Sequence, residues 1–166
     1  MLEVTRSYEE ARLLAARGEL EHALALLDSI LEHNADHLGA LLLKASLLVE
    51  SRGAEAALEL YDRAVRDAPH SAEAHNDRAR CLHALGRDEE ALAVAERARG
   101  LLEEGDNYKQ GAPVYLTLLW CLRELRKYRE ALALAEEGLA RWPDAVLAQW
   151  ASLVEEELAE AEKEEC

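Results

Sequence analysis

Residues 75–98 read HNDRARCLHALGRDEEALAVAERA, and this stretch decides the fold. Small and apolar residues recur in it at the spacing of one helical face, both before and after Gly86. Glycine commonly ends a helix because it adopts the left-handed backbone conformation without a steric penalty. The stretch therefore predicts two amphipathic helices, over residues 74–85 and 89–102, joined by a turn at 86–88.

The same pattern recurs along the chain at a nearly constant interval. Alanines in the phrase EALA and its relatives are separated by 34, 34 and 40 residues. These alanines are Ala23, Ala57, Ala91 and Ala131. A small residue at this position lets two helix backbones approach closely. The interval predicts a repeat architecture in which each unit is one helix pair, with turns at Gly18, Arg52-Gly53, Gly86 and Arg126-Lys127.

Residues at the ends of the expected helices agree with this division. Ser71 and Asp144 precede apolar segments and are expected to cap the helices that follow them. Pro69 and Pro143 are expected to end the second helices of the second and fourth units, because proline cannot continue a helix.

The composition excludes several classes of function. The 166 residues include 19 Lys plus Arg and 34 Asp plus Glu, which gives a net charge of −15. Such a charge disfavours binding to nucleic acid, where basic side chains replace phosphate counterions, and to anionic membranes. It favours basic partners. No apolar run approaches the roughly 20 residues of a membrane span, so we expect no membrane insertion.

The N-terminal residues lack the apolar core of a signal peptide. The cysteines, Cys81, Cys121 and Cys166, are odd in number and contain no CxxC spacing. This is no disulfide framework, so a reducing compartment is the simpler interpretation and a cytoplasmic location is expected. We expect Cys81 and Cys121 to be buried thiols beside core leucines.

The repeat resembles the tetratricopeptide repeat family, which has a 34-residue helix–turn–helix unit. In the third unit the family's signature positions are occupied by Ala79, Leu82, Gly86, Ala91, Ala95 and Ala98. The resemblance implies an all-α fold, a right-handed α-solenoid of four helix–turn–helix repeats plus a C-terminal capping helix. It implies a single domain over residues 1–166. The repeats are expected at about 4–37, 38–71, 72–105 and 112–145, and the capping helix at about 146–165.

Two segments depart from the repeat. Six extra residues lie around 103–111, as a solvated loop or as a loop that contacts a partner. The capping helix has apolar residues, among them Trp150, on one side and many glutamates on the other. It is expected to cover the apolar face of the last repeat. Its acidic side is a solvated face or a contact for a basic partner.

Motifs that carry chemistry are scarce in the sequence. It contains no Gly-rich phosphate loop and no GxSxG. His33 and His37 have a spacing that suits a metal on one helix, but they fall at a helix end and in a turn. His75 is expected in helix packing. We therefore expect no catalytic residues, no metal and no cofactor, and the protein is not expected to be an enzyme.

Stacked helix pairs form a concave face, and the resemblance implies that the first helix of each pair lines it. The expected groove residues are Tyr8, Arg12, Leu42, Ser46, Asn76, Arg80, His83, Leu116, Trp120 and Arg123. Trp120 is either an anchor for a partner or packed against the capping helix. Arg12 and Arg80 either take a carboxylate of a partner or form ion pairs with nearby acids.

These observations predict a protein–protein interaction module, a scaffold that binds a peptide or helix of a partner in its concave groove. Two alternatives stay open. One is a dedicated chaperone for a secreted or assembling protein, and the other is a homo-oligomeric assembly module.

Overall fold

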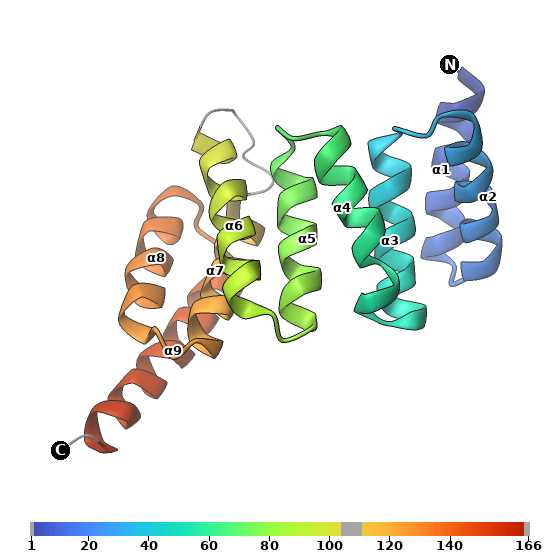
Figure 1. The fold of residues 1–166 in the computed structure, drawn as a ribbon. Coiled ribbons are helices and arrows are strands. Elements are labelled where there is room, and N and C mark those ends of the chain that lie inside the picture. Colours follow the sequence, from blue (N-terminus) through green and yellow to red (C-terminus); the bar gives the residue numbers. More distant parts are fainter. Residues whose placement is uncertain (1, 104–110, 165–166) are drawn as a thin grey trace. The chain divides into compact units, whose positions relative to one another are not determined.

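The structure, a computed structural model, describes residues 2–103 and 111–164, and these form nine α-helices and one short 3-10 helix (Figure 1). No strand occurs in these ranges, and the all-α fold class is confirmed. The elements are α1 (Leu2–Ala16), α2 (Leu20–His33), α3 (Leu38–Arg52), η1 (Ala54–Ala56), α4 (Leu58–Asp67), α5 (Ala72–Ala84), α6 (Asp88–Glu103), α7 (Gly111–Glu124), α8 (Tyr128–Arg141) and α9 (Ala145–Glu164).

The chain divides into two compact units. Unit 1 is Met1–His70 and contains α1 to α4, while unit 2 is Ser71–Cys166 and contains α5 to α9. The boundary falls where the sequence separates its second and third repeats. The single domain over residues 1–166 stays a prediction, and the two units are described separately below.

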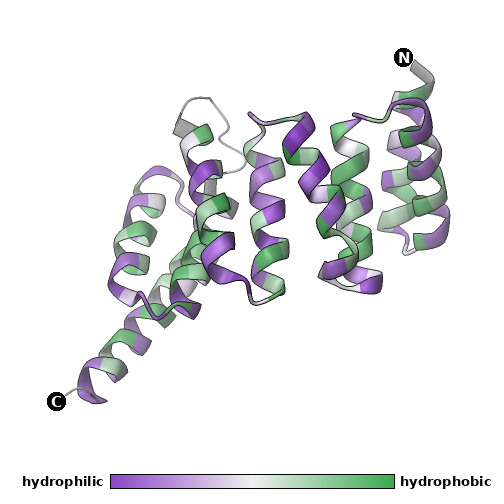
Figure 2. Cartoon of the chain, in the orientation of Figure 1, coloured by the Kyte–Doolittle hydropathy of each residue, from purple (hydrophilic) through white to green (hydrophobic). Residues whose placement is uncertain are grey.

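In unit 1, α1 packs against α2, and α3 packs against η1 and α4. Each expected small residue at these contacts is fully buried: Ala11, Ala23, Ala45 and Ala57. The second pair departs from a simple hairpin, because the 3-10 helix follows Gly53 and delays the start of α4 to Leu58. Each helix carries both apolar and polar stretches, as the amphipathic pattern requires (Figure 2).

Unit 2 contains two complete hairpins, α5–α6 and α7–α8, followed by α9. Its largest fully buried side chains come mainly from α7, among them Tyr115, Leu118 and Leu119. Helix α9 contacts both α7 and α8 and buries Leu147 and Val154 in the same core. It therefore covers the last hairpin, as expected for a capping helix. The six inserted residues mostly lie outside the described residues, and so does Cys166.

The predicted helix ends are confirmed. The Ser71 hydroxyl accepts a hydrogen bond from the Ala74 amide at 3.1 Å, and an Asp144 carboxylate oxygen accepts one from Leu147 at 2.9 Å. Helices α4 and α8 end two residues before Pro69 and Pro143. His37 was expected only in a turn, but Nδ1 of its ring accepts a hydrogen bond from the Ala40 amide and caps α3.

All four hairpin turns contain a residue in the left-handed backbone region. Three are glycines, Gly18, Gly53 and Gly86, with φ of 77°, 88° and 70°. The fourth is Arg126, with φ of 58°. A side chain with a Cβ carries a penalty of roughly 1 kcal/mol in this conformation, so Arg126 is the strained position of the set.

We predict that Arg126→Gly raises the free energy of unfolding by about 0.5–1 kcal/mol, because it removes this penalty at an exposed turn. Gly86→Ala makes the reverse change in the turn of the preceding hairpin. It should lower the free energy of unfolding by a similar amount through backbone strain alone, because nothing lies within 4 Å of the added Cβ. Urea unfolding of both variants checks this. A destabilised Arg126→Gly protein would contradict the assignment of strain.

Gly138 on α8 lies where side chains of α7 and α9 come close to the helix backbone. A Cβ at this position would lie 2.6 Å from an atom of the Tyr115 ring and 3.0 Å from a Leu147 methyl group. Tyr115 is fully buried, stacks obliquely on Trp142 at 5.4 Å between ring centroids, and donates a hydrogen bond from its hydroxyl to Glu137. The ring therefore has little freedom to move aside.

We predict that Gly138→Ala destabilises the protein by about 1–3 kcal/mol through this clash. The matched control is Gly100→Ala on α6, where nothing lies within 4 Å of the added Cβ. It should stabilise by about 0.5–1 kcal/mol, because alanine suits a helix better than glycine. Thermal and urea unfolding measure both changes, and equal effects of the two substitutions would contradict the packing.

Candidate functional site

In unit 1, the groove residues expected on α1 differ in exposure. Tyr8 is half-buried, because its ring lies over Gly39 and 5.1 Å from the ring of His37. Arg12 is exposed and forms an ion pair with Glu9, one turn earlier, at 3.2 Å. The ion-pair alternative for Arg12 is thus the one found, while a role in binding stays a prediction.

The groove residues expected on α3 are less accessible. Leu42 was expected on the exposed face, but only 7% of it is exposed, and it belongs to the core. Ser46 is half-buried and donates a hydrogen bond from its hydroxyl to the Leu43 carbonyl at 2.9 Å. Leu42 is buried because the sequence places apolar residues on several sides of α3, so its helix packs over more than one face.

In unit 2, four side chains from α5, α7 and α9 form one continuous row, here called the aromatic row: His83, Trp120, Trp150 and Arg123. The His83 ring stacks on Trp120 with centroids 6.0 Å apart and planes at 20°. Trp120 meets Trp150 edge-on at 5.9 Å. The Arg123 guanidinium lies 5.7 Å from the centre of the Trp150 ring. Sequence reasoning identified three of the four as groove residues and assigned Trp150 only to the capping helix.

The repeat explains why the row forms. His83 and Arg123 occupy equivalent positions in successive units, and each lies against a tryptophan of the next first helix or of α9. Helix α7 contacts both α5 and α9, which brings these positions together. An aromatic ring under a cation adds attraction on top of the apolar area it buries. The row is therefore a property of the stacked helices of unit 2.

Trp120 packs against the capping helix, which was one of its two expected roles. It is half-buried, and its indole Nε1 is buried without a hydrogen-bond partner among the described residues. Arg123 holds Glu157 of α9 through bonds of 2.8 Å and 2.5 Å and also contacts Glu124 at 3.0 Å. The hydrogen bonds that Arg123 donates to the Glu157 carboxylate raise the pKa of the guanidinium. These contacts fix the row to α9.

Around the row, the remaining predicted residues divide between core and surface. Arg80 is the most accessible, with 55% of its side chain exposed and a long ion pair of 3.6 Å to Asp77. Leu116 is half-buried and packs against the core. Asn76 was expected on the groove, but it is 5% exposed, and its Oδ1 has no hydrogen-bond partner among the described residues. His75 is buried, which confirms its expected packing, and desolvation lowers the pKa of its ring.

Asp77 is the one acid of this region whose protonation is strongly perturbed. Burial raises the pKa of its carboxyl from 3.8 to about 6, Arg80 opposes the rise, and Glu73 adds to it. Because the folded state holds the proton more tightly than the unfolded state, the free energy of unfolding falls as the pH rises from about 4 to about 6. Above that window the cost of the buried charge is constant.

We predict that Asp77→Asn is more stable than the wild type above pH 6, by about 1–3 kcal/mol. The amide avoids the buried charge and keeps the shape of the side chain. As the pH falls through about 4 the difference should disappear, because the wild-type carboxyl then becomes protonated in the unfolded state as well. Unfolding measured at pH 4 and pH 7 checks this, and a difference that does not change between the two pH values would contradict it.

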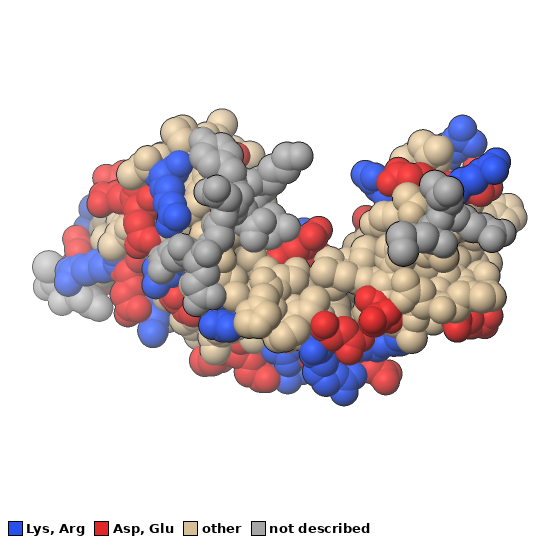
Figure 3. Space-filling model, turned by 90° about the horizontal axis from the view of Figure 1, so that it is seen from above, with Lys and Arg blue, Asp and Glu red and all other residues tan. Residues whose placement is uncertain are grey.

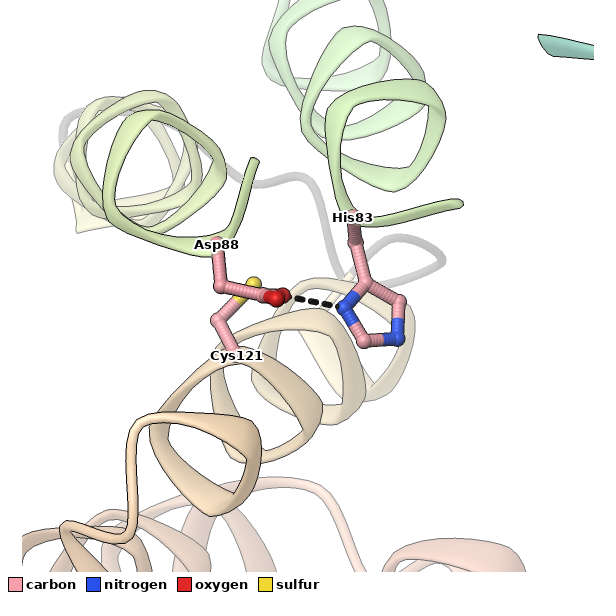
Figure 4. Close-up of side chains that lie close together, drawn as sticks. All are labelled: His83, Asp88 and Cys121. Carbon is pink, nitrogen blue, oxygen red and sulfur yellow. Dashed lines mark hydrogen bonds and ion pairs between the residues drawn. The ribbon is translucent and has the colours of Figure 1, made fainter. Parts of the chain in front are cut away.

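A second cluster in unit 2 brings together His83, Asp88 and Cys121, here called the thiol cluster (Figure 4). The three residues come from the end of α5, the start of α6 and the last turn of α7. His83 Nδ1 lies 2.5 Å from an Asp88 carboxylate oxygen, and one ligand atom of each residue lies within 4.8 Å of the others. Cys121 is fully buried, whereas the other two are half-buried.

Sequence reasoning missed this cluster. It treated Cys121 as a buried thiol without a neighbouring base, and the burial is confirmed. Burial, together with the charge of Asp88, raises the pKa of the Cys121 thiol to about 12. At neutral pH the sulfur therefore carries its proton, and the environment is the opposite of the electropositive niche that activates a nucleophilic cysteine.

The described residues also form an open groove of about 700 Å³ beside the turn between α7 and α8. It is lined by Arg126 to Glu130 and by the last turns of α9, from Leu158 to Glu164. Charged side chains dominate its rim, and Arg129 pairs with Glu162 across it at 2.8 Å. On the face shown in Figure 3, acidic and basic side chains are interspersed. Among the described helices, none combines the length and the apolar character that crossing a membrane requires.

Comparisons with known proteins agree with this geometry. A sequence model of the tetratricopeptide repeat matches residues 42–112 and 116–154. No curated protein matches the chain. Similar solved structures include MamA, with 19% identity and a TM-score of 0.74, covering 94% of this chain and 83% of that one.

Two further structures have the same fold. The structure of PilF from Pseudomonas aeruginosa is 19% identical with a TM-score of 0.82, and the match covers 95% of this chain and 69% of that one. YrrB, described as a TPR protein with an unusual peptide-binding site, is 22% identical with a TM-score of 0.68, covering 89% of this chain and 74% of that one. The family match extends over more than half of the sequence, and the structural matches share its helical solenoid class. The chain therefore belongs to the tetratricopeptide repeat family.

Proposed function

We propose that this protein is an interaction module that holds a peptide or helix of a partner protein on the aromatic row of unit 2. The observation that carries the proposal is the row itself, in which successive first helices and α9 present His83, Trp120, Trp150 and Arg123 side by side. Repeat proteins use the surface formed by such equivalent positions to bind extended partners. Scaffolding between proteins is the general role of this family.

The chemistry of the row indicates the kind of segment that it would hold. Tryptophan rings offer a large rigid contact area at little cost in conformational entropy, which is why they are frequent anchors at interfaces. Arg80, on the same helix as His83, is exposed and only loosely paired, so its guanidinium is available to a carboxylate. A partner segment with one apolar side chain beside an acidic residue fits these groups.

Several sequence-based expectations belong to the same proposal. We propose a cytoplasmic location because the three cysteines are odd in number and have no CxxC spacing, which suits a reducing compartment. A charge of −15 opposes nucleic acid as a partner. We propose that the module works by binding alone, without catalysis. The peptide-binding site named for YrrB supports binding as the shared task of the fold, although it is a property of that protein.

The proposal is tested by selecting peptides from a random displayed library on the full chain and measuring their affinity for two charge-reversal variants. Arg80→Glu places a repulsive charge beside the row, whereas the matched control Arg129→Glu changes an exposed arginine of α8. We predict that Arg80→Glu weakens the selected peptides by about tenfold or more, about 1.4 kcal/mol. Arg129→Glu should leave their affinity unchanged.

Two results would contradict this function. One is the loss of peptides in Arg129→Glu with full binding to Arg80→Glu, which would move the binding surface to the groove beside α9. The other is an absence of selected peptides together with a molecular mass that rises with concentration. That result would favour the homo-oligomeric alternative over a partner-binding module.

A further inference from the structure

The thiol cluster has a composition that the interaction function does not require. It joins an imidazole, a carboxylate and a thiol, three side chains that ligate metals, from three different helices of unit 2. In the view of Figure 4 the Asp88 carboxylate lies between the His83 ring nitrogen and the Cys121 sulfur, and the three residues come from neighbouring helices. The two more accessible groups, His83 and Asp88, already touch at 2.5 Å.

We propose that His83, Asp88 and Cys121 form a binding site for a divalent transition-metal ion, with Zn²⁺ as the ion that best fits the donors. Zn²⁺ takes nitrogen, thiolate and carboxylate ligands together and prefers four-coordinate tetrahedral geometry. Hard cations such as Mg²⁺ and Ca²⁺ take oxygen ligands and do not favour a thiolate. The combination of nitrogen, oxygen and sulfur ligands therefore favours an ion of intermediate hardness such as Zn²⁺.

The geometry is close to what such an ion needs. Metal–ligand distances of about 2.0–2.1 Å for nitrogen and oxygen and about 2.3 Å for sulfur place tetrahedral ligand atoms roughly 3.3–3.6 Å apart. The three ligand atoms here lie within 4.8 Å of one another, so side-chain movements of about 1 Å would bring them to these separations. Binding would separate the His83 nitrogen and the Asp88 oxygen by about 1 Å from their present contact. Half-burial of both residues leaves the fourth position for water.

The charges also balance. When the metal binds, the S–H bond of Cys121 breaks, the sulfur forms a bond to the metal, and the proton passes to the buffer. The resulting thiolate and the Asp88 carboxylate together carry two negative charges, which the divalent ion neutralises. The Trp120 ring stacked on His83 holds the imidazole in place, the role that an outer shell has in metal sites.

The combination of His83, Asp88 and Cys121 is not repeated at the equivalent positions of the neighbouring units. One unit later, the residues equivalent to His83 and Asp88 are Arg123 and Tyr128, and one unit earlier they are Val49 and Ala54. None of these is a usual ligand of Zn²⁺. Cys81, the counterpart of Cys121 in the preceding unit, is also a buried cysteine. It therefore serves as a matched control for the sulfur.

The test is a titration of the full chain with Co²⁺, which reports thiolate coordination through a charge-transfer absorption band, followed by displacement with Zn²⁺. All proteins carry Cys166→Ser, so that only the two internal thiols remain. We expect one equivalent of Co²⁺ to give the band and Zn²⁺ to abolish it. His83→Gln and Asp88→Asn should each weaken binding about tenfold or more, Cys121→Ser should remove the band, and Cys81→Ser should keep it.

Circular dichroism of each metal-free variant establishes that it is folded. His83→Gln and Asp88→Asn substitute half-buried residues, so we expect both variants to fold. They therefore test the metal site even if Cys121→Ser fails to fold. The proposal is overturned if the unsubstituted site gives no charge-transfer band. It is also overturned if the band survives Cys121→Ser, or if Zn²⁺ affinity is unchanged in both His83→Gln and Asp88→Asn, which would place the ion on other histidines.

Discussion

The close approach of two helices at a small residue is the constraint on which the rest of this structure depends. Ala23, Ala57, Ala91 and Ala131 stand at the same point of four successive repeats, and each is completely buried. The first helices of the first three repeats also carry a fully buried small residue at one shared position, Ala11, Ala45 and Ala79, whereas the fourth carries Leu119 there. A longer side chain at these points would hold the helices apart. The hairpin, and not the single helix, is thus the unit that the sequence specifies.

Regular hairpins have a consequence for function. When one hairpin packs on the next, equivalent positions of their first helices become neighbours although they are 34 or 40 residues apart. In unit 2 this places aromatic and cationic side chains in one row and brings a histidine, an aspartate and a cysteine together a short distance away. In such a chain each repeat contributes one side chain to a given row on the surface. The packing core decides where each of these residues lies.

The fold was predictable because the signal is repeated. In the third unit the expected helices, 74–85 and 89–102, differ by one or two residues from Ala72–Ala84 and Asp88–Glu103. The 3-10 turn before α4 was not predicted, because it depends on the local conformation after Gly53 and has no counterpart among the other described hairpin turns.

The candidate site was predictable only in part. A repeat position specifies the side of the helix on which a residue lies, but not how closely the neighbouring side chains cover it, so Leu42 and Asn76 were expected on the surface and are buried. Trp120 was expected either to anchor a partner or to pack against the capping helix. The sequence could not decide between these roles, because the repeat pattern did not define which residues of α9, such as Trp150, would face Trp120. The thiol cluster was missed because it combines three helices and a specific side-chain conformation of His83. Its sequence signal was weak: a histidine and an aspartate around one turn, with a cysteine one unit later.

The central claim is that small residues at the crossing points hold each hairpin together, and it is tested most directly by enlarging one of them. Ala91→Leu fills the crossing of α5 and α6, whereas Ala93→Leu adds the same atoms to an exposed position of the same helix. Urea unfolding should show a loss of about 2 kcal/mol or more for Ala91→Leu and a change within about 0.5 kcal/mol for Ala93→Leu. Equal stability of the two variants would contradict the account.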